Sequence, residues 1–257
     1  MKMHLKILLL LILTNTAATC QTNKKTSKQK FETTTDSIVF FDQSRNRKVP
    51  VLFYFPKSKA KIKGMKPVII SHGYSYNKPG AYAEYASIAK NLAANGFYVA
   101  SIEHDLPTDD LVPLEGKPQI VRRPAWEKGS KNIFFVIGEL KKQYPELDFK
   151  KLTLIGHSNG GDMSALFAHQ HPEMAAKVVT LDNRRMKLPR TANPKIYSLR
   201  SSDQPADEGV LPTAEEQKKF GITIVKLQNT IHNDMGDRGT SEQKNEINRY
   251  IIDFLNH

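Results

Sequence analysis

One short segment constrains the fold more than any other, the turn Gly156-His157-Ser158-Asn159-Gly160. An apolar, β-rich run at 152–155 leads straight into this turn, and residues 160–169 after it favour a helix. A serine at the tip of a sharp strand-to-helix turn needs small residues two positions before and two after it, because strand and helix approach each other closely there. The pattern therefore predicts an open sheet covered by helices, with Ser158 held out of it as a nucleophile.

The rest of the chain supports one α/β domain, residues 35–257, since 257 residues with 39% hydrophobic side chains suit a single large core. Two β-rich runs separated by a turn-like segment predict an N-terminal antiparallel hairpin, and after Pro67 strands alternate with helices. Such alternation predicts a mostly parallel sheet of about eight strands with helices on both faces. The expected strands are 37–42, 49–55, 68–71, 97–102, 152–155, 178–181, 196–199 and 222–227, and the expected helices are 82–94, 129–144, 160–169 and 241–255.

A nucleophilic serine on this kind of turn needs a histidine as general base, placed later in the chain and after an acid. His169 and His171 lie on or just beyond the helix that follows the serine, and His257 ends the chain. His232 falls in a loop between the last expected strand and the last expected helix, which is where the base belongs. We therefore expect His232 to take the proton of Ser158.

Three aspartates are candidates for the acid behind the histidine. Asp203 follows the strand 196–199, the commonest place for it, and is favoured. Asp182 ends the preceding strand and is the alternative, and Asp207 ranks third. Arg184 and Arg185 give Asp182 another role, as a buried ion pair that fixes its loop.

Two backbone N–H groups are expected to stabilise an oxyanion. One belongs to Asn159, at the start of the helix after the serine, where the helix dipole adds to its effect. The other belongs to Tyr74, because the strand 68–71 runs into His72-Gly73 and the glycine allows a sharp turn towards Ser158. The long segment 105–129 is expected to form part of the pocket rim.

The N-terminus is expected to be a processing segment outside the fold. Residues 1–19 combine two lysines with a short apolar run and a small, polar stretch, which is typical of a signal peptide. Cys20, the single cysteine, stands at the cleavage position, and two alternatives stay open there, lipidation with membrane anchorage and simple cleavage with secretion. Residues 20–34 are expected to form a flexible tether. Either way the domain is predicted to be exported.

The net charge of +12 comes from scattered basic residues without interleaved aromatics, which favours a solvated basic surface over nucleic-acid binding. His169-Gln170-His171 lacks a nearby set of carboxylates, so no metal site is expected there. Oligomeric state is not predicted by any pattern in the chain.

Between residues 65 and 185 the chain resembles a known superfamily, that of the α/β-hydrolases. Ile70-Ser71-His72-Gly73, Gly96-Phe97-Tyr98-Val99-Ala100, Glu103-His104, Gly156-His157-Ser158 and Leu181-Asp182 are similar, in this order, to platelet-activating-factor acetylhydrolases and to their cutinase-like, polyester-hydrolase and dienelactone-hydrolase-like relatives.

This resemblance implies a serine hydrolase that cleaves small-molecule or lipid-like carboxylic esters without a metal or an organic cofactor. The acetylhydrolases carry their acid where Asp182 stands, whereas the cutinase-like proteins carry it where Asp203 stands, so the resemblance leaves both open. Two other functions also remain open: peptide or thioester cleavage at the same site, and a catalytically silent surface binding protein of the same fold.

Overall fold

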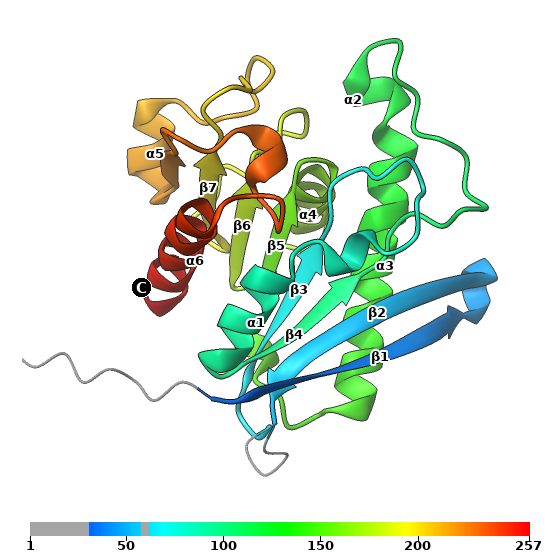
Figure 1. Cartoon of the computed structure of the whole chain (residues 1–257). Coiled ribbons are helices and arrows are strands. Elements are labelled where there is room, and N and C mark those ends of the chain that lie inside the picture. The colour runs from blue at the N-terminus through cyan, green and yellow to red at the C-terminus, as the bar shows by residue number, and fades with distance from the viewer. Residues whose placement is uncertain (1–30, 58–61) are drawn as a thin grey trace, which may run out of the picture.

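The chain forms one eight-stranded sheet with helices on both faces, as the sequence predicts (Figure 1). The computed structural model describes residues 31–57 and 62–257. The strand order is β1-β2-β4-β3-β5-β6-β7-β8, with β2 antiparallel to β1 and β4 and every later pair parallel. The predicted signal peptide, Cys20 and most of the predicted tether lie outside the described residues.

The N-terminal hairpin consists of β1 (Thr33–Asp42) and β2 (Arg47–Pro56), joined by a short turn in which Asn46 takes a left-handed conformation with φ 49°. β1 begins four residues before the predicted strand. It is an edge strand, and most of its side chains face solvent, so its first residues lack the apolar alternation that marks a half-buried strand.

The central strands are short and almost wholly buried. They are β3 (Lys66–Ser71), β4 (Phe97–Ile102), β5 (Thr153–His157), β6 (Lys177–Leu181) and β7 (Lys195–Arg200). The last strand, β8 (Thr223–Lys226), forms the other edge of the sheet and is only partly buried. Successive side chains enter opposite cores, since Ile69 packs into one apolar cluster and Val68 and Ile70 into the other. The uninterrupted apolar runs predicted from the sequence are explained by this burial on both faces.

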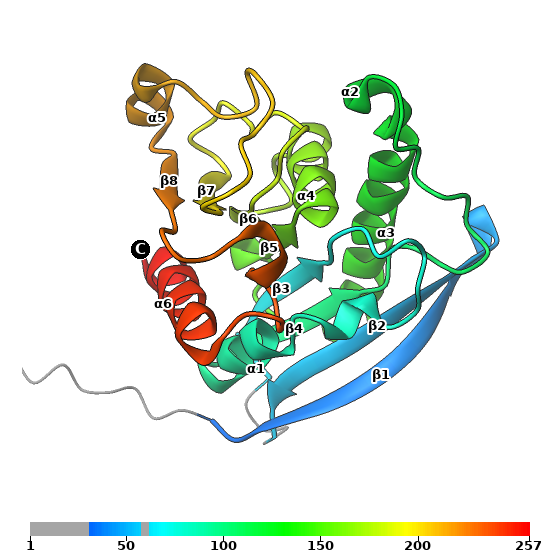
Figure 2. The same cartoon turned by 45° about the horizontal axis from the view of Figure 1, so that its top comes forward.

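The helices divide between the two faces (Figure 2). α1 (Ala86–Ala94) and α6 (Ser241–Asn256) cover one side, and α3 (Arg123–Gln143) and α4 (Asn159–Gln170) cover the other. α3 begins six residues before the predicted helix because Pro124 occupies its first turn, where proline is tolerated. None of the helices in the described parts of the chain is long and apolar enough to cross a membrane.

Two short helices were not predicted, α2 (Pro118–Val121) and α5 (Ala214–Phe220). For α5 the sequence carried a signal: Thr213 and Glu216 form a reciprocal capping box, and Gly221 ends the helix in the left-handed conformation with φ 66°. α2 has no comparable side-chain cap, but Pro118 stands at its first position, which is a local signal for the start of a helix.

Candidate active site

Ser158 stands at the tip of the turn between β5 and α4, with φ 49° and ψ −117°. This conformation is costly for a residue with a side chain, so the surroundings must hold it. A Cβ at Gly156 would lie 2.2 Å from the carbonyl oxygen of Gly160, and one at Gly160 would lie 2.2 Å from that of Ser71. The two glycines are therefore required by the close approach of strand and helix, as the sequence predicts.

The side chain of His232 connects Ser158 with Asp182. His232 Nε2 lies 3.0 Å from Ser158 Oγ, and His232 Nδ1 lies 2.5 Å from Asp182 Oδ2. The parallel strands β5 and β6 end side by side at one edge of the sheet, which brings the residues that follow them together. A hydroxyl, an imidazole and a carboxylate in this order form the hydrogen-bonded chain that activates a serine.

Asp182 is completely buried and is held by three further groups besides the imidazole. Arg200, the last residue of β7, makes an ion pair through Nη2 with Asp182 Oδ1 at 2.8 Å. Ser201 donates its N–H to Oδ1 at 3.0 Å and its hydroxyl to Oδ2 at 2.8 Å. Burial raises the pKa of this carboxyl, but the bond to His232 and the charge of Arg200 outweigh it, so the pKa lies below its ordinary value.

Asp203 was expected to be the acid that contacts the imidazole of His232, but the structure places it elsewhere. Asp203 is exposed, and its Oδ1 accepts the backbone N–H of His232 at 2.8 Å, whereas the ring contacts Asp182. The reason is placement along the strands. Asp182 directly follows β6, beside Ser158, with φ 55°, whereas Asp203 lies three residues beyond β7, past the buried edge of the sheet. Asp207, the third candidate, accepts a bond from Gln119 instead.

The ion pair expected between Asp182 and Arg184 or Arg185 is also replaced, because Arg200 takes that position. Arg200 additionally donates from Nη1 to the carbonyl oxygen of Asn183 at 2.6 Å. The sequence could not single out Arg200, since a strand-end arginine usually reaches solvent and only the pairing of β6 with β7 places it here.

The loop after β3 lies against Ser158. A Cβ at Gly73 would lie 3.0 Å from His157 Nδ1, which is tighter than an ordinary contact, and 3.5 Å from Ser158 Cβ, so a larger residue here would press on the His157 ring. The N–H of Gly73 donates to Tyr85 Oη at 3.1 Å and is therefore occupied. Among the described residues, no acceptor pairs with the N–H groups of Tyr74 and Asn159, the two expected oxyanion donors.

A hydrogen-bonded chain that the sequence did not reveal joins this loop to the histidine loop. Tyr85 Oη, which accepts the Gly73 N–H, donates to His157 Nδ1 at 2.7 Å, and His157 Nε2 donates to the carbonyl oxygen of His232 at 3.0 Å. The carbonyl oxygen can only accept, which fixes the tautomer of His157. Burial and the neighbouring His232 lower the pKa of His157 to about 3, so the ring stays neutral.

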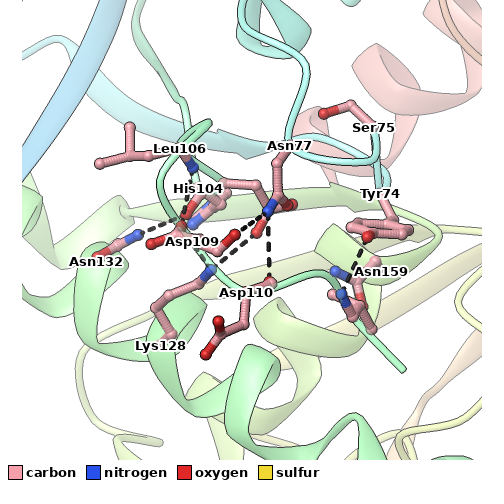
Figure 3. Close-up of polar contacts among 12 residues, drawn as sticks. Tyr74, Ser75, Asn77, His104, Leu106, Asp109, Asp110, Lys128, Asn132 and Asn159 are labelled. Atoms are coloured by element: carbon pink, nitrogen blue, oxygen red, sulfur yellow. Dashed lines mark hydrogen bonds and ion pairs between the residues drawn. The ribbon is translucent and has the colours of Figure 1, made fainter.

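The segment 105–129, which was expected to form part of the pocket rim, takes part in a polar network beside Tyr74 (Figure 3), but none of its residues lines the small cavity at Ser158 and His232. Tyr74 Oη accepts the N–H of Val112 at 3.0 Å, and Asn77 Nδ2 donates to the carbonyl oxygen of Asp109 at 2.7 Å. Lys128, on α3, reaches Asp109 at 2.8 Å. These bonds fix the segment that follows β4 against Tyr74.

Trp126 of α3 contacts Asn159, the residue after Ser158. Its indole Nε1 donates to Asn159 Oδ1 at 2.8 Å, and both side chains are buried. Because the indole can only donate, the amide of Asn159 is oriented with its oxygen towards α3. The Nδ2 atom of Asn159 is then buried without a hydrogen-bond partner.

Ser158 and His232 open into a small cavity of about 100 Å³, whose polar lining includes Tyr85, His157 and Asp237. A larger cavity of about 680 Å³ lies away from these residues, between α3 and the hairpin turn. Within the described parts of the chain, no three His, Cys, Asp or Glu side chains are grouped so that they could hold a metal ion.

Comparisons with solved structures agree with the fold. Esterase Est22, in a structure with p-nitrophenol, superposes with a TM-score of 0.64 at 12% identity, over 87% of this chain and 80% of that one. Esterase 2 of Thermogutta terrifontis, phosphonylated by cyclosarin, gives 0.65 at 14% identity, over 86% and 92%. A dienelactone hydrolase-like promiscuous phosphotriesterase, P91, gives 0.64 at 13% identity, over 87% and 98%. This chain has the α/β-hydrolase fold.

The sequence comparisons cover a much smaller part of the chain than the structural ones. No family model matches the chain. A serine hydrolase-like protein of Danio rerio is 35% identical over 48 residues, which are 19% of this chain and 15% of that protein. The α/β-hydrolase fold is thus carried by the whole described domain, while the sequence likeness covers a small part of both proteins.

Proposed function

We propose that this protein is a serine hydrolase that cleaves carboxylic esters through an acyl-enzyme. One observation carries the proposal, the continuous chain from Ser158 Oγ through His232 to the buried Asp182, at 3.0 Å and 2.5 Å. Two of the three structural neighbours named above are esterases, which supports an ester as the substrate.

In the first half of the reaction, Ser158 Oγ attacks the ester carbonyl while His232 Nε2 takes its proton. Asp182 keeps the imidazole in the tautomer that exposes Nε2 and stabilises the ring once it is protonated. The N–H groups of Tyr74 and Asn159 hold the oxyanion, and α4 adds its positive end. His232 then gives its proton to the departing alkoxide.

In the second half, a water molecule takes the place of the alcohol. His232 removes a proton from this water, which attacks the acyl carbonyl, and the same oxyanion donors stabilise the second tetrahedral intermediate. His232 finally returns a proton to Ser158 Oγ, which releases the acid and restores the enzyme.

The test is to label the purified protein with a fluorophosphonate probe and to measure the hydrolysis of 4-nitrophenyl butyrate. Ser158→Ala is expected to abolish labelling and to reduce kcat by about 10⁴-fold or more. Ser75→Ala is the matched control, because its hydroxyl bonds the carbonyl oxygen of Lys78 in the neighbouring loop. If the probe did not label the wild-type protein, a catalytically silent binding protein would be favoured. If thioesters or peptides were cleaved faster than esters, they would replace carboxylic esters as the proposed substrate class.

We further propose that the domain works outside the cytoplasm, on the basis of the pattern in residues 1–19 and the position of Cys20. Mass spectrometry of the mature protein distinguishes a lipidated Cys20 from simple cleavage. An N-terminus that still carries residues 1–19 would contradict export through this segment.

A further inference from the structure

His72, the first residue after β3, is a buried histidine that the proposed reaction does not use. Its Nδ1 atom donates to the carbonyl oxygen of Gly73 at 2.6 Å. A carbonyl oxygen can only accept a hydrogen bond, so this nitrogen carries a proton. The carbonyl belongs to the peptide group between Gly73 and Tyr74, which also contains the Tyr74 N–H, one of the two expected oxyanion donors.

The trans geometry of this peptide group fixes the direction of the Tyr74 N–H. In a trans peptide the C=O and N–H bonds point in opposite directions, and this bond is trans. His72 holds the carbonyl from the buried side and does not line the cavity at Ser158, whereas Gly73 and Tyr74 do. The Tyr74 N–H therefore points away from the imidazole, towards the side on which the cavity lies.

Glu103 holds the ring of His72 at its other nitrogen. β3 and β4 are parallel neighbours that end at the same edge, so the residues that follow them lie side by side. Glu103 Oε1 lies 3.2 Å from His72 Nε2, and both side chains are buried. Glu103 Oε2 accepts the N–H of Gly80 at 2.8 Å. One carboxylate thus contacts both the ring and the far end of the loop that begins at His72.

The contacts at Nε2 keep the proton of His72 on Nδ1. The backbone N–H of His104 reaches Nε2 at 2.9 Å, which suits the neutral ring with its proton on Nδ1. Burial lowers the pKa of His72, but the bond to Glu103 and the charge of Glu103 raise it by more. In the cationic ring both nitrogens carry protons. In either state Nδ1 can therefore donate to Gly73.

The groups next to the Tyr74 N–H are bonded within the protein. The N–H of Gly73 donates to Tyr85 Oη at 3.1 Å, and Tyr74 Oη accepts the N–H of Val112 at 3.0 Å. The Tyr74 N–H itself has no acceptor among the residues that the structure describes. A donor that is fixed in place but left unpaired is preorganised for an oxyanion, because no bond must break when the charge develops.

We propose that His72, held by Glu103, is a positioning residue that orients the peptide group whose Tyr74 N–H binds the oxyanion. The inference rests on the proposed ester hydrolysis and adds a second imidazole–carboxylate pair to it. The two pairs differ in their tasks, since His232 takes and returns a proton whereas His72 keeps its own. The effect of His72 falls on the transition state, in which the oxygen bound by the N–H carries its charge.

The first test compares two substitutions of His72 in the hydrolysis of 4-nitrophenyl butyrate. His72→Leu removes the donor, whereas His72→Asn carries an amide N–H near the position of Nδ1, and both lose the contact with Glu103. We expect His72→Leu to reduce kcat by about 10- to 100-fold with KM within about twofold, because oxyanion donors act in the transition state. His72→Asn should recover at least about fivefold of this loss.

A second readout separates the orientation of the donor from a general loosening of the site. The ketone 1,1,1-trifluoropentan-2-one forms a tetrahedral adduct with the serine of a hydrolase, and the oxyanion of the adduct needs the same donors as the reaction. Its inhibition constant should rise in His72→Leu by about the factor by which kcat/KM falls. A fall in kcat/KM with an unchanged inhibition constant would show that the ring does not act through the oxyanion donor.

His104→Leu is the matched control. His104 is as buried as His72, and the centroids of the two rings are 5.5 Å apart. Its ring nitrogens have no hydrogen-bond partner among the described residues, so it should keep the kcat and the inhibition constant of the wild-type protein. An equal loss in this control would assign the effect to burial of a ring rather than to the bond with Gly73.

Glu103→Gln tests the carboxylate, because glutamine can still accept the N–H of Gly80 but carries no charge. We expect kcat to fall by about fivefold to tenfold in the wild-type background. No further loss is expected in the His72→Leu background, because Glu103 acts through the ring. Losses that simply multiply would contradict this part of the proposal.

The outcomes separate this inference from the proposed function. If His72→Leu folds and keeps the wild-type kcat, the inference is overturned and ester hydrolysis stands. If His72→Leu does not fold, His72→Gln decides, since its longer polar side chain places the amide near Nε2 instead of Nδ1 and should lose activity where His72→Asn does not. Wild-type protein that neither cleaves the ester nor reacts with the fluorophosphonate probe would instead contradict the proposed function.

Discussion

Two neighbouring strand ends each supply an aspartate to His232, and the two contacts differ in kind. Asp182, after β6, is buried and contacts the imidazole at Nδ1, with Arg200 and Ser201 around it. Asp203, after β7, is exposed and accepts the backbone N–H of the same histidine. One aspartate therefore contacts the imidazole ring, and the other holds the backbone of the loop that carries it. Sequence position alone does not distinguish these two contacts, because both residues follow strands that end at the same edge.

The difference between the two aspartates is tested most strongly by neutralising Asp182. Asp182→Asn is expected to reduce kcat by about 10⁴-fold, because an amide cannot hold the imidazole in the required tautomer or stabilise it when protonated. Hydrolysis of 4-nitrophenyl butyrate measures the loss, with circular dichroism to show that the variant folds. A larger loss in Asp203→Asn than in Asp182→Asn would reverse the roles assigned to the two residues.

A second experiment removes the cation behind Asp182. Arg200→Met leaves the buried carboxylate without its ion-pair partner, which raises the pKa of Asp182 and weakens its hold on the imidazole. We expect kcat to fall by about 10- to 100-fold and the free energy of unfolding, measured in urea, to fall by about 3 kcal/mol.

Arg200→Lys serves as its matched control, because it retains the charge and should recover part of both losses. If Arg200→Met matched the wild-type protein in kcat and stability, the ion pair would have no role at this site.

Neutralising Asp203 should have a much smaller effect. Asp203→Ala removes the acceptor of the His232 N–H, but the group is exposed and water can take its place. We expect kcat to fall by less than about tenfold and stability by about 1 kcal/mol or less. Steady-state kinetics and urea unfolding test both values, and a loss near that of Asp182→Asn would show that Asp203 acts on the ring.

The smallest expected effect is the pH dependence of stability. The pKa of Asp182 in the folded protein lies below its ordinary value of 3.8, because its bonds to His232 and Arg200 outweigh burial. Its contribution to stability is therefore present above pH about 4 and is lost as the pH falls through the folded pKa.

Urea unfolding at pH 7 and pH 3 should show that the difference between wild-type protein and Asp182→Asn shrinks at the lower pH. For Asp203→Asn, which changes an exposed carboxyl, the difference should stay small at both. A stability difference for Asp182→Asn that grew on acidification would contradict the lowered pKa.

The nucleophile turn and the fold could be predicted because their signals are local. Gly156, Ser158 and Gly160 lie within five residues, and the strands on either side carry their own apolar pattern. The position of His232 follows from the order of elements. The choice between Asp182 and Asp203 depends instead on which strand end faces the ring, which no local pattern encodes. Tyr85 and Arg200 contact the site from distant segments, so their parts became visible only in the folded chain.

The chain from Gly73 through Tyr85 and His157 to the His232 carbonyl has a practical consequence for protein engineering. It joins the loop of the expected oxyanion donors to the loop of the base, and Asp237 adds a second link by accepting the N–H groups of Ala86 and Ser87 at 2.9 Å each. A designer who widens the site by shifting either loop will displace the other as well.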